Sequence, residues 1–89
     1  MHSPSATLLI IDDDQVVRAS LAAYLEDSGF NVLQASNGLQ GLEVFERDHP
    51  DLVICDLRMP QVDGLELIRR INALQVETPV IVVSGAGVM

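Results

Sequence analysis

TLLIIDDD, residues 7 to 14, joins a short apolar run to three consecutive acidic residues. Two further apolar runs end in a polar side chain: LVIC (52–55) is followed by Asp56, and PVIVV (79–83) by Ser84. Short all-apolar runs separated by amphipathic stretches are typical of buried parallel strands with covering helices. Open α/β sheets bind their ligands at the C-terminal ends of such strands. The pattern therefore predicts a site for a divalent cation beside a reactive carboxylate.

Length and composition narrow the classes of protein. A chain of 89 residues, 48% hydrophobic, is enough for one small domain with its own core. A net charge of −8 argues against a nucleic-acid partner, because such binding depends on Lys and Arg, and the chain contains no lysine. The single cysteine, Cys55, lies in an apolar run and is expected to pack in the core. No segment is long enough to span a membrane, and the leader does not resemble a signal peptide, so we expect a cytoplasmic protein.

The order of the expected elements predicts the fold class. We expect strands at about 8–11, 31–35, 52–55 and 79–84, and helices at about 15–28, 39–47 and 64–74. Asp14 is placed to cap the first helix, Gly29 to end it, and Pro50 to end the second. The pattern β-α-β-α-β-α-β predicts an α/β, doubly wound parallel sheet with helices on both faces. The apolar residues expected to face the core from the first two helices are Val17, Leu21, Tyr24, Leu25, Leu39, Leu42 and Phe45.

The acidic residues indicate phosphoryl chemistry if the first and third strands are neighbours. Asp12, Asp13 and Asp56 would then converge, and without a cation at least one of them should have a raised pKa. Mg²⁺ prefers oxygen ligands and would relieve that repulsion. Asp56 could attack phosphorus to form an aspartyl phosphate, and Ser84 could donate its hydroxyl to a phosphoryl oxygen. The alternative that Asp12 and Asp13 are simple turn residues remains open, and Asp14 fits a helix cap better than a ligand.

With these motifs together, the chain resembles the receiver domains of bacterial two-component response regulators, the flavodoxin-like fold typified by the chemotaxis protein CheY. The resemblance covers essentially residues 6 to 87. The segments that carry it are LIIDDD (9–14), DLVICDLRMPQVDG (51–64) and TPVIVVSG (78–85).

The resemblance implies a role for each matching residue. Asp56 matches the phosphoacceptor, and Ser84 matches the switch hydroxyl. Asp13 matches the direct metal ligand, and Asp12 matches the acid that acts largely through water. Arg58 matches the position whose backbone carbonyl binds the metal. The implied cofactor is Mg²⁺, and the implied partner is a sensor histidine kinase or a phosphotransfer protein.

The chain also departs from the family pattern. The family has a lysine at the end of a fifth strand, which this chain lacks, and none of its five arginines lies beyond Arg70. We expect a receiver domain over residues 1–89 that is truncated after the fourth strand, without the fourth helix, the fifth strand and the fifth helix. The edge at 79–84 would then favour self-association. The segments IDDD (11–14) and SGAGVM (84–89) resemble, more narrowly, receivers of RssB-type regulators.

The residues are compatible with three classes of function. The leading hypothesis is a phosphoacceptor signalling module that serves an output domain or partner protein outside this chain and is not an enzyme, since it catalyses only its own phosphorylation. The second is a receiver-like interaction module that is not phosphorylated, which the absence of lysine favours. The third is a phosphohydrolase with an aspartyl nucleophile. Asp12 and Asp14 form an Asp-x-Asp after a strand, but Val16 stands where such enzymes have threonine.

Overall fold

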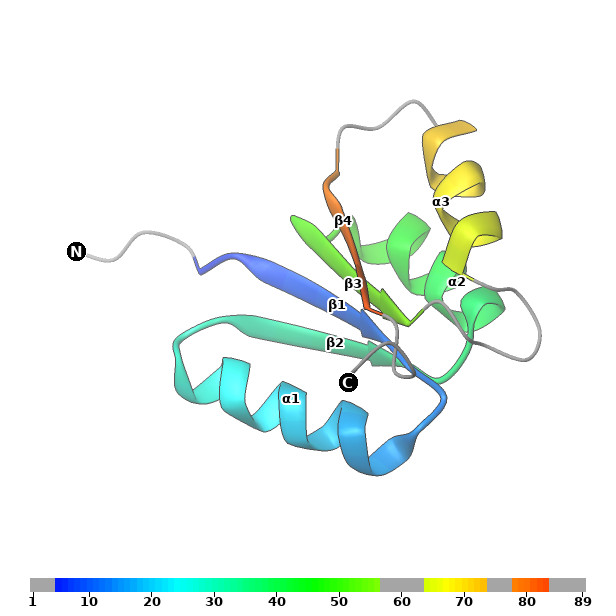
Figure 1. Cartoon of the computed structure of the whole chain (residues 1–89). Coiled ribbons are helices and arrows are strands. Elements are labelled where there is room, and N and C mark those ends of the chain that lie inside the picture. Colours follow the sequence, from blue (N-terminus) through cyan, green and yellow to red (C-terminus); the bar gives the residue numbers. More distant parts are fainter. Residues whose placement is uncertain (1–4, 57–63, 74–77, 84–89) are drawn as a thin grey trace.

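The computed structural model describes residues 5–56, 64–73 and 78–83, and all structural statements below refer to these ranges. Strands and helices alternate along them as the sequence predicts (Figure 1). The strands are β1 (Thr7–Ile11), β2 (Asn31–Ala35), β3 (Leu52–Asp56) and β4 (Val80–Val83). The helices are α1 (Gln15–Asp27), α2 (Gly38–Asp48) and α3 (Gly64–Ala73). None of these helices has the length and apolar character needed to cross a membrane.

The four strands form one parallel sheet in the order β2-β1-β3-β4. The chain moves outward from β1 to β2 and then crosses back over β1 to reach β3. Because parallel crossovers are right-handed, this reversal places α1 on one face and α2 on the other. Figure 1 shows α1 apart from the pair formed by α2 and α3. The fold is therefore the doubly wound, flavodoxin-like arrangement, and its direction reverses between β1 and β3.

The main core lies between the sheet and the helices α2 and α3. Alternate residues of the strands point toward it, because successive side chains of a strand face opposite sides of the sheet. Cys55 is fully buried there, as expected. The buried members of this core are Leu9, Ile11, Ala35, Val44, Phe45, Val53, Cys55 and Ile71.

The predicted helix signals are confirmed at both ends of α1 and at the end of α2. The Asp14 carboxylate accepts hydrogen bonds from the backbone N–H groups of Val16 (2.9 Å) and Val17 (3.1 Å). Gly29 follows α1 with φ of 101°, a left-handed conformation that glycine adopts without strain. Residue His49, at φ 49°, ends α2 immediately before Pro50.

Three of the residues expected to face the core are exposed, so those predictions were wrong. Val17 and Tyr24 are 50% and 68% exposed. Helix α1 instead packs on β2 and β1 with the side that carries the buried Ala22. Leu39 is 49% exposed, because the buried side of α2 is centred on Gly41 and Phe45, and a rotation of about 100° per residue places Leu39 on the far side.

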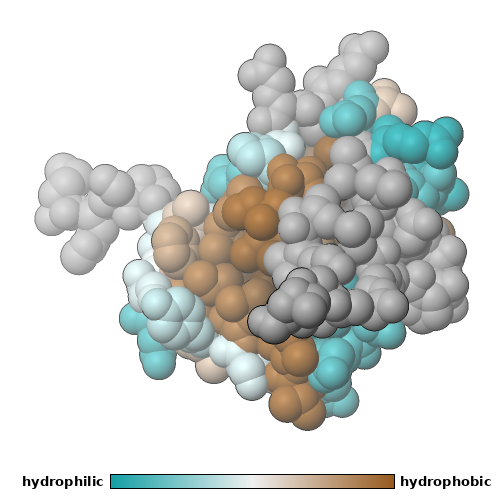
Figure 2. All heavy atoms as spheres, in the orientation of Figure 1, coloured by the Kyte–Doolittle hydropathy of each residue, from teal (hydrophilic) through white to brown (hydrophobic). Residues whose placement is uncertain are grey.

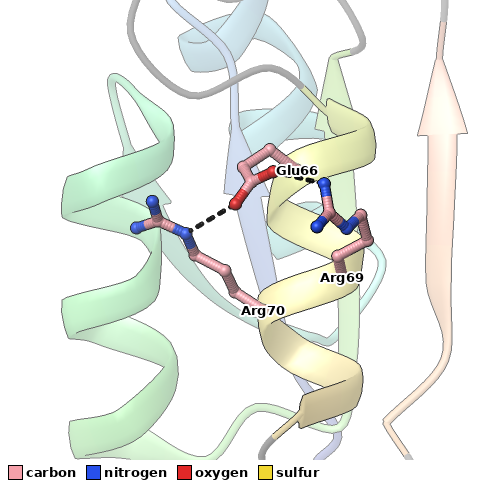
Figure 3. Close-up of polar contacts among 3 residues, drawn as sticks. All are labelled: Glu66, Arg69 and Arg70. Atoms are coloured by element: carbon pink, nitrogen blue, oxygen red, sulfur yellow. Dashed lines mark hydrogen bonds and ion pairs between the residues drawn. The ribbon is translucent and has the colours of Figure 1, made fainter.

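Helix α3 carries its charged residues Arg69 and Arg70 on its exposed side. Glu66 accepts a hydrogen bond from Arg69 (2.9 Å) and one from Arg70 (3.1 Å), as Figure 3 shows. Exposed pairs of this kind contribute at most about 1 kcal/mol each. Both ion pairs join residues of α3 itself and stabilise only the helix, so the burial of Ile71 in the core is what holds α3 against the sheet.

Candidate metal centre

Strand register brings the three acidic residues of the predicted site together. Strands β1 and β3 are parallel neighbours, and Ile11 lies opposite Cys55. The next residue of each segment, Asp12 and Asp56, therefore lies at the same edge of the sheet. Asp56 is itself the last residue of β3. One carboxylate oxygen each of Asp12, Asp13 and Asp56 lies within 4.8 Å of the other two. We call these three residues the acidic cluster; its predicted convergence is confirmed.

The backbone of Asp12 is held on several sides. Its N–H donates to the Ala35 carbonyl of β2 (3.1 Å), and its own carbonyl accepts from Arg18 Nη1 (2.7 Å). Its Oδ1 accepts from the backbone N–H of Asp14 (2.9 Å), which closes a tight turn at the end of β1. Asp13 is exposed, whereas Asp12 and Asp56 are half-buried. The cluster therefore opens to solvent at Asp13 and backs onto the sheet at the other two residues.

Arg18 is the residue that sequence reasoning missed. The only signal was its isolation, because it is the sole Lys or Arg among the first 46 residues and follows the acidic triad closely. The sequence does not predict its contact with a main-chain carbonyl, because an arginine close to several acidic residues is expected to pair with a carboxylate.

The electrostatics of the cluster agree with crowded carboxylates. Partial burial raises the pKa of Asp12 most, and the negative charges of Asp56, Asp13 and Asp14 raise it further. The hydrogen bond from the Asp14 N–H acts in the opposite direction and does not cancel the rise. The sequence predicts that at least one carboxylate of the cluster has a raised pKa without a cation, and Asp12 is that carboxylate.

The raised pKa predicts the effect of neutralising Asp12. Between the ordinary and the raised pKa the folded chain binds more protons than the unfolded chain, so the free energy of unfolding falls as pH rises through the folded pKa. Asp12→Asn keeps an acceptor for the Asp14 N–H and removes this decrease in the free energy of unfolding, because asparagine does not ionise. In EDTA the variant should be more stable than the wild type at neutral pH, and the difference should shrink on acidification.

Urea denaturation at neutral and mildly acidic pH measures this difference, with Asp27→Asn as a control for removing an exposed carboxylate at the far end of α1. A variant less stable than the wild type at neutral pH in EDTA would contradict the assigned electrostatics.

The donor set fits a hard divalent cation. Mg²⁺ bonds oxygen at about 2.0–2.1 Å, so two of its ligands are separated by at most about 4.2 Å. One carboxylate oxygen from each residue of the cluster lies within 4.8 Å of the others, which is close to that separation. The other two residues predicted from the resemblance, Arg58 and Ser84, lie outside the described residues, so their roles stay predictions.

Comparison with known proteins defines the class. Residues 8–89 match the model of the response regulator receiver domain. The chain is 34% identical over 80 residues to sporulation initiation phosphotransferase F of Bacillus subtilis, which covers 90% of this chain and 64% of that protein. It is 41% identical over 86 residues to the transcriptional regulatory protein GlrR of Escherichia coli, covering 97% of this chain and 19% of that protein.

A solved CheY-like receiver domain from Methanospirillum hungatei superimposes with a TM-score of 0.89 at 28% identity, covering 97% of this chain and 69% of that one. This chain therefore belongs to the response regulator receiver domain family, in which an aspartate typically accepts a phosphoryl group. It spans less than two thirds of the length of the two curated relatives named above.

Proposed function

We propose that this chain is a phosphoacceptor module that takes a phosphoryl group onto Asp56 with the help of Mg²⁺. The observation that carries the proposal is the convergence of Asp12, Asp13 and Asp56 at the C-terminal edge of two adjacent parallel strands. Sheets of this type bind their ligands at that edge, where the strand order reverses. The donor would be a sensor histidine kinase or a phosphotransfer protein in the cytoplasm. An output domain or partner protein outside this chain would read the result.

The side chains have distinct roles in the proposed transfer. Asp13, Asp56 and the backbone carbonyl of Arg58 would bind Mg²⁺ directly, and Asp12 would act largely through water. When bound, Mg²⁺ supplies the positive charge that lets an anionic phosphoryl group approach a carboxylate. A carboxylate oxygen of Asp56 forms the new O–P bond as the P–N bond to the donor histidine breaks, and the released imidazole nitrogen keeps the electron pair. Ser84 would donate its hydroxyl to a phosphoryl oxygen.

Intact mass after incubation with acetyl phosphate and Mg²⁺ tests this proposal. The wild type should gain one phosphoryl group that hydroxylamine removes, because an acyl phosphate is labile to that nucleophile. Asp56→Asn should gain none. Asp27→Asn is the matched control, since it removes one carboxylate from an exposed position and should be phosphorylated like the wild type. Phosphate on the Asp56→Asn variant would place the acceptor elsewhere.

The second candidate is a receiver-like interaction module that is not phosphorylated. The composition of these 89 residues favours it, because they include no lysine that could contact a phosphoryl group. The same experiment separates the two candidates. If the wild type folds and binds Mg²⁺ but gains no phosphoryl group from acetyl phosphate, the interaction module is the better description.

We also propose that the chain self-associates through the sheet face beside α1. Ile54 and Ile81 are opposite each other on β3 and β4 and point away from the main core, with Ile81 49% exposed. Figure 2 shows apolar side chains gathered in a band over this side of the molecule. The net charge of −8 opposes association, so salt should strengthen it by screening.

Sedimentation velocity over a range of concentrations checks this expectation. Ile81→Thr should weaken association more than Leu39→Thr, because both residues are 49% exposed but Leu39 is on α2, which covers the other face. A species that remains monomeric at high protein and salt concentration would refute the proposal.

A further inference from the structure

Arg18 connects three segments that meet behind the acidic cluster. Its guanidinium donates from two different nitrogens: Nη1 to the carbonyl oxygen of Asp12 (2.7 Å) and Nε to Oε1 of Gln34 on β2 (3.2 Å). Its backbone N–H donates to the carbonyl of Asp14 in the first turn of α1 (2.9 Å). Arg18 is half-buried and its bond to the Asp12 carbonyl is partly shielded from water, whereas its bond to Gln34 is exposed.

The hydrogen bond from Arg18 to the Asp12 carbonyl also restrains the backbone between Asp12 and Asp13. The carbonyl of Asp12 and the nitrogen of Asp13 belong to the same planar peptide unit. The Asp12 N–H is already held by Ala35 on β2, so anchoring its carbonyl leaves the backbone at Asp12 little freedom to rotate. The directions in which the Asp12 and Asp13 side chains leave the backbone are then determined before any ligand arrives.

We propose that Arg18 is a positioning residue, which orients the peptide between Asp12 and Asp13 so that the acidic cluster is preorganised to bind a divalent cation. The inference rests on the proposed function in one respect, that the cluster binds Mg²⁺, and does not depend on phosphorylation. Groups that orient metal ligands typically change metal affinity on the order of 10- to 100-fold when they are removed. The two-nitrogen geometry is specific to arginine, because lysine offers a single ammonium group.

A purely electrostatic role would have the opposite sign. The guanidinium of Arg18 and Mg²⁺ are both cations and repel each other, so removing the charge of Arg18 alone would tighten Mg²⁺ binding. Positioning requires that removal of the two-nitrogen contact weaken binding, whether or not the charge is kept. The direction of the change therefore separates the two roles.

Titration calorimetry with MgCl₂ on the full chain tests the proposal in four single variants and one double variant. Arg18→Lys keeps the charge and loses the two-nitrogen contact, and Arg18→Gln loses both. Gln34→Ala removes one of the two anchors without changing the charge. Arg47→Gln is the matched control, since it removes the same charge from an exposed residue that pairs with Asp48 at the C-terminal end of α2.

Both Arg18 variants should weaken Mg²⁺ binding about tenfold, Gln34→Ala should weaken it less, and Arg47→Gln should leave it close to the wild type. The double variant Arg18→Gln with Gln34→Ala should bind no more weakly than Arg18→Gln alone, because the two residues act through one contact. Tighter binding by Arg18→Gln, or unchanged binding by both Arg18 variants, overturns the proposal. So does a loss of thermal stability in EDTA with no change in Mg²⁺ affinity, which would mean a structural role only.

The outcome is distinguishable from failure of the proposed function. Mg²⁺ binding that depends on Arg18 in a chain that gains no phosphoryl group would support the positioning role and refute phosphoacceptance. If the wild type is phosphorylated while Arg18→Lys binds Mg²⁺ normally, phosphoacceptance is supported and the positioning role of Arg18 is refuted. A wild type that does not bind Mg²⁺ would refute both.

Discussion

Replacing Asp13 with alanine should weaken Mg²⁺ binding by at least about a hundredfold, whereas replacing its neighbour Asp14 should change binding little. Asp13 is the exposed member of the acidic cluster and the proposed direct ligand. Losing a direct ligand should weaken metal binding more than losing a group that only orients a ligand. The Asp14 carboxylate accepts from the N–H groups of Val16 and Val17, which is the contact of a helix cap. Its backbone N–H, which supports Asp12, survives in Asp14→Ala.

The two substitutions should also differ in their effect on stability, and here Asp14→Ala should have the larger effect. Loss of a helix cap costs about 1 kcal/mol, so Asp14→Ala should lower the free energy of unfolding in EDTA. Asp13→Ala should not lower it, because it removes one charge from a repelling group. Titration calorimetry and urea denaturation on both variants measure the two effects. Equal losses of Mg²⁺ affinity would show that the assignment of ligand and cap is wrong.

Mg²⁺ should raise the melting temperature of the chain on the order of 10–20 °C at concentrations near a hundred times its dissociation constant. A ligand that binds only the folded state contributes about 2.7 kcal/mol at that concentration, and 1 kcal/mol corresponds to about 4–8 °C in a domain of this size. Folding brings Asp56 to Asp12 and Asp13, from which it is distant along the unfolded chain, so the cation binds the folded state preferentially. Removal with EDTA should reverse the shift.

Thermal denaturation followed by circular dichroism checks this prediction, with NaCl at matched ionic strength as the control for screening of the net charge of −8. Asp13→Ala is the second control, since it should lose most of the response to Mg²⁺ and keep the response to NaCl. An equal rise in NaCl and MgCl₂ would mean that screening, and not a bound cation, stabilises the chain.

The order of elements, the helix ends and the members of the acidic cluster were all predictable from the sequence. Each depends on local chemistry or on a simple rule of topology. An aspartate before a helix caps it, a glycine after a helix adopts a left-handed conformation, and apolar runs between amphipathic segments form parallel strands. Once β1 and β3 are neighbours, their C-terminal residues must meet at one edge, so Asp12 and Asp56 converge without further information.

The tertiary structure alone decided which sides of the helices are buried and what supports the cluster. Val17 and Leu39 have the apolar character and spacing of core residues, yet both are exposed, because burial depends on where a helix lies on the sheet. Gly41 illustrates the same point: α2 approaches β1 so closely that a Cβ there would lie 2.9 Å from Cγ1 of Ile11, next to the cluster. The contact of Arg18 with the Asp12 carbonyl is of this kind too. Periodicity specifies a direction around one helix axis, whereas the distance and angle between elements follow from packing the whole core.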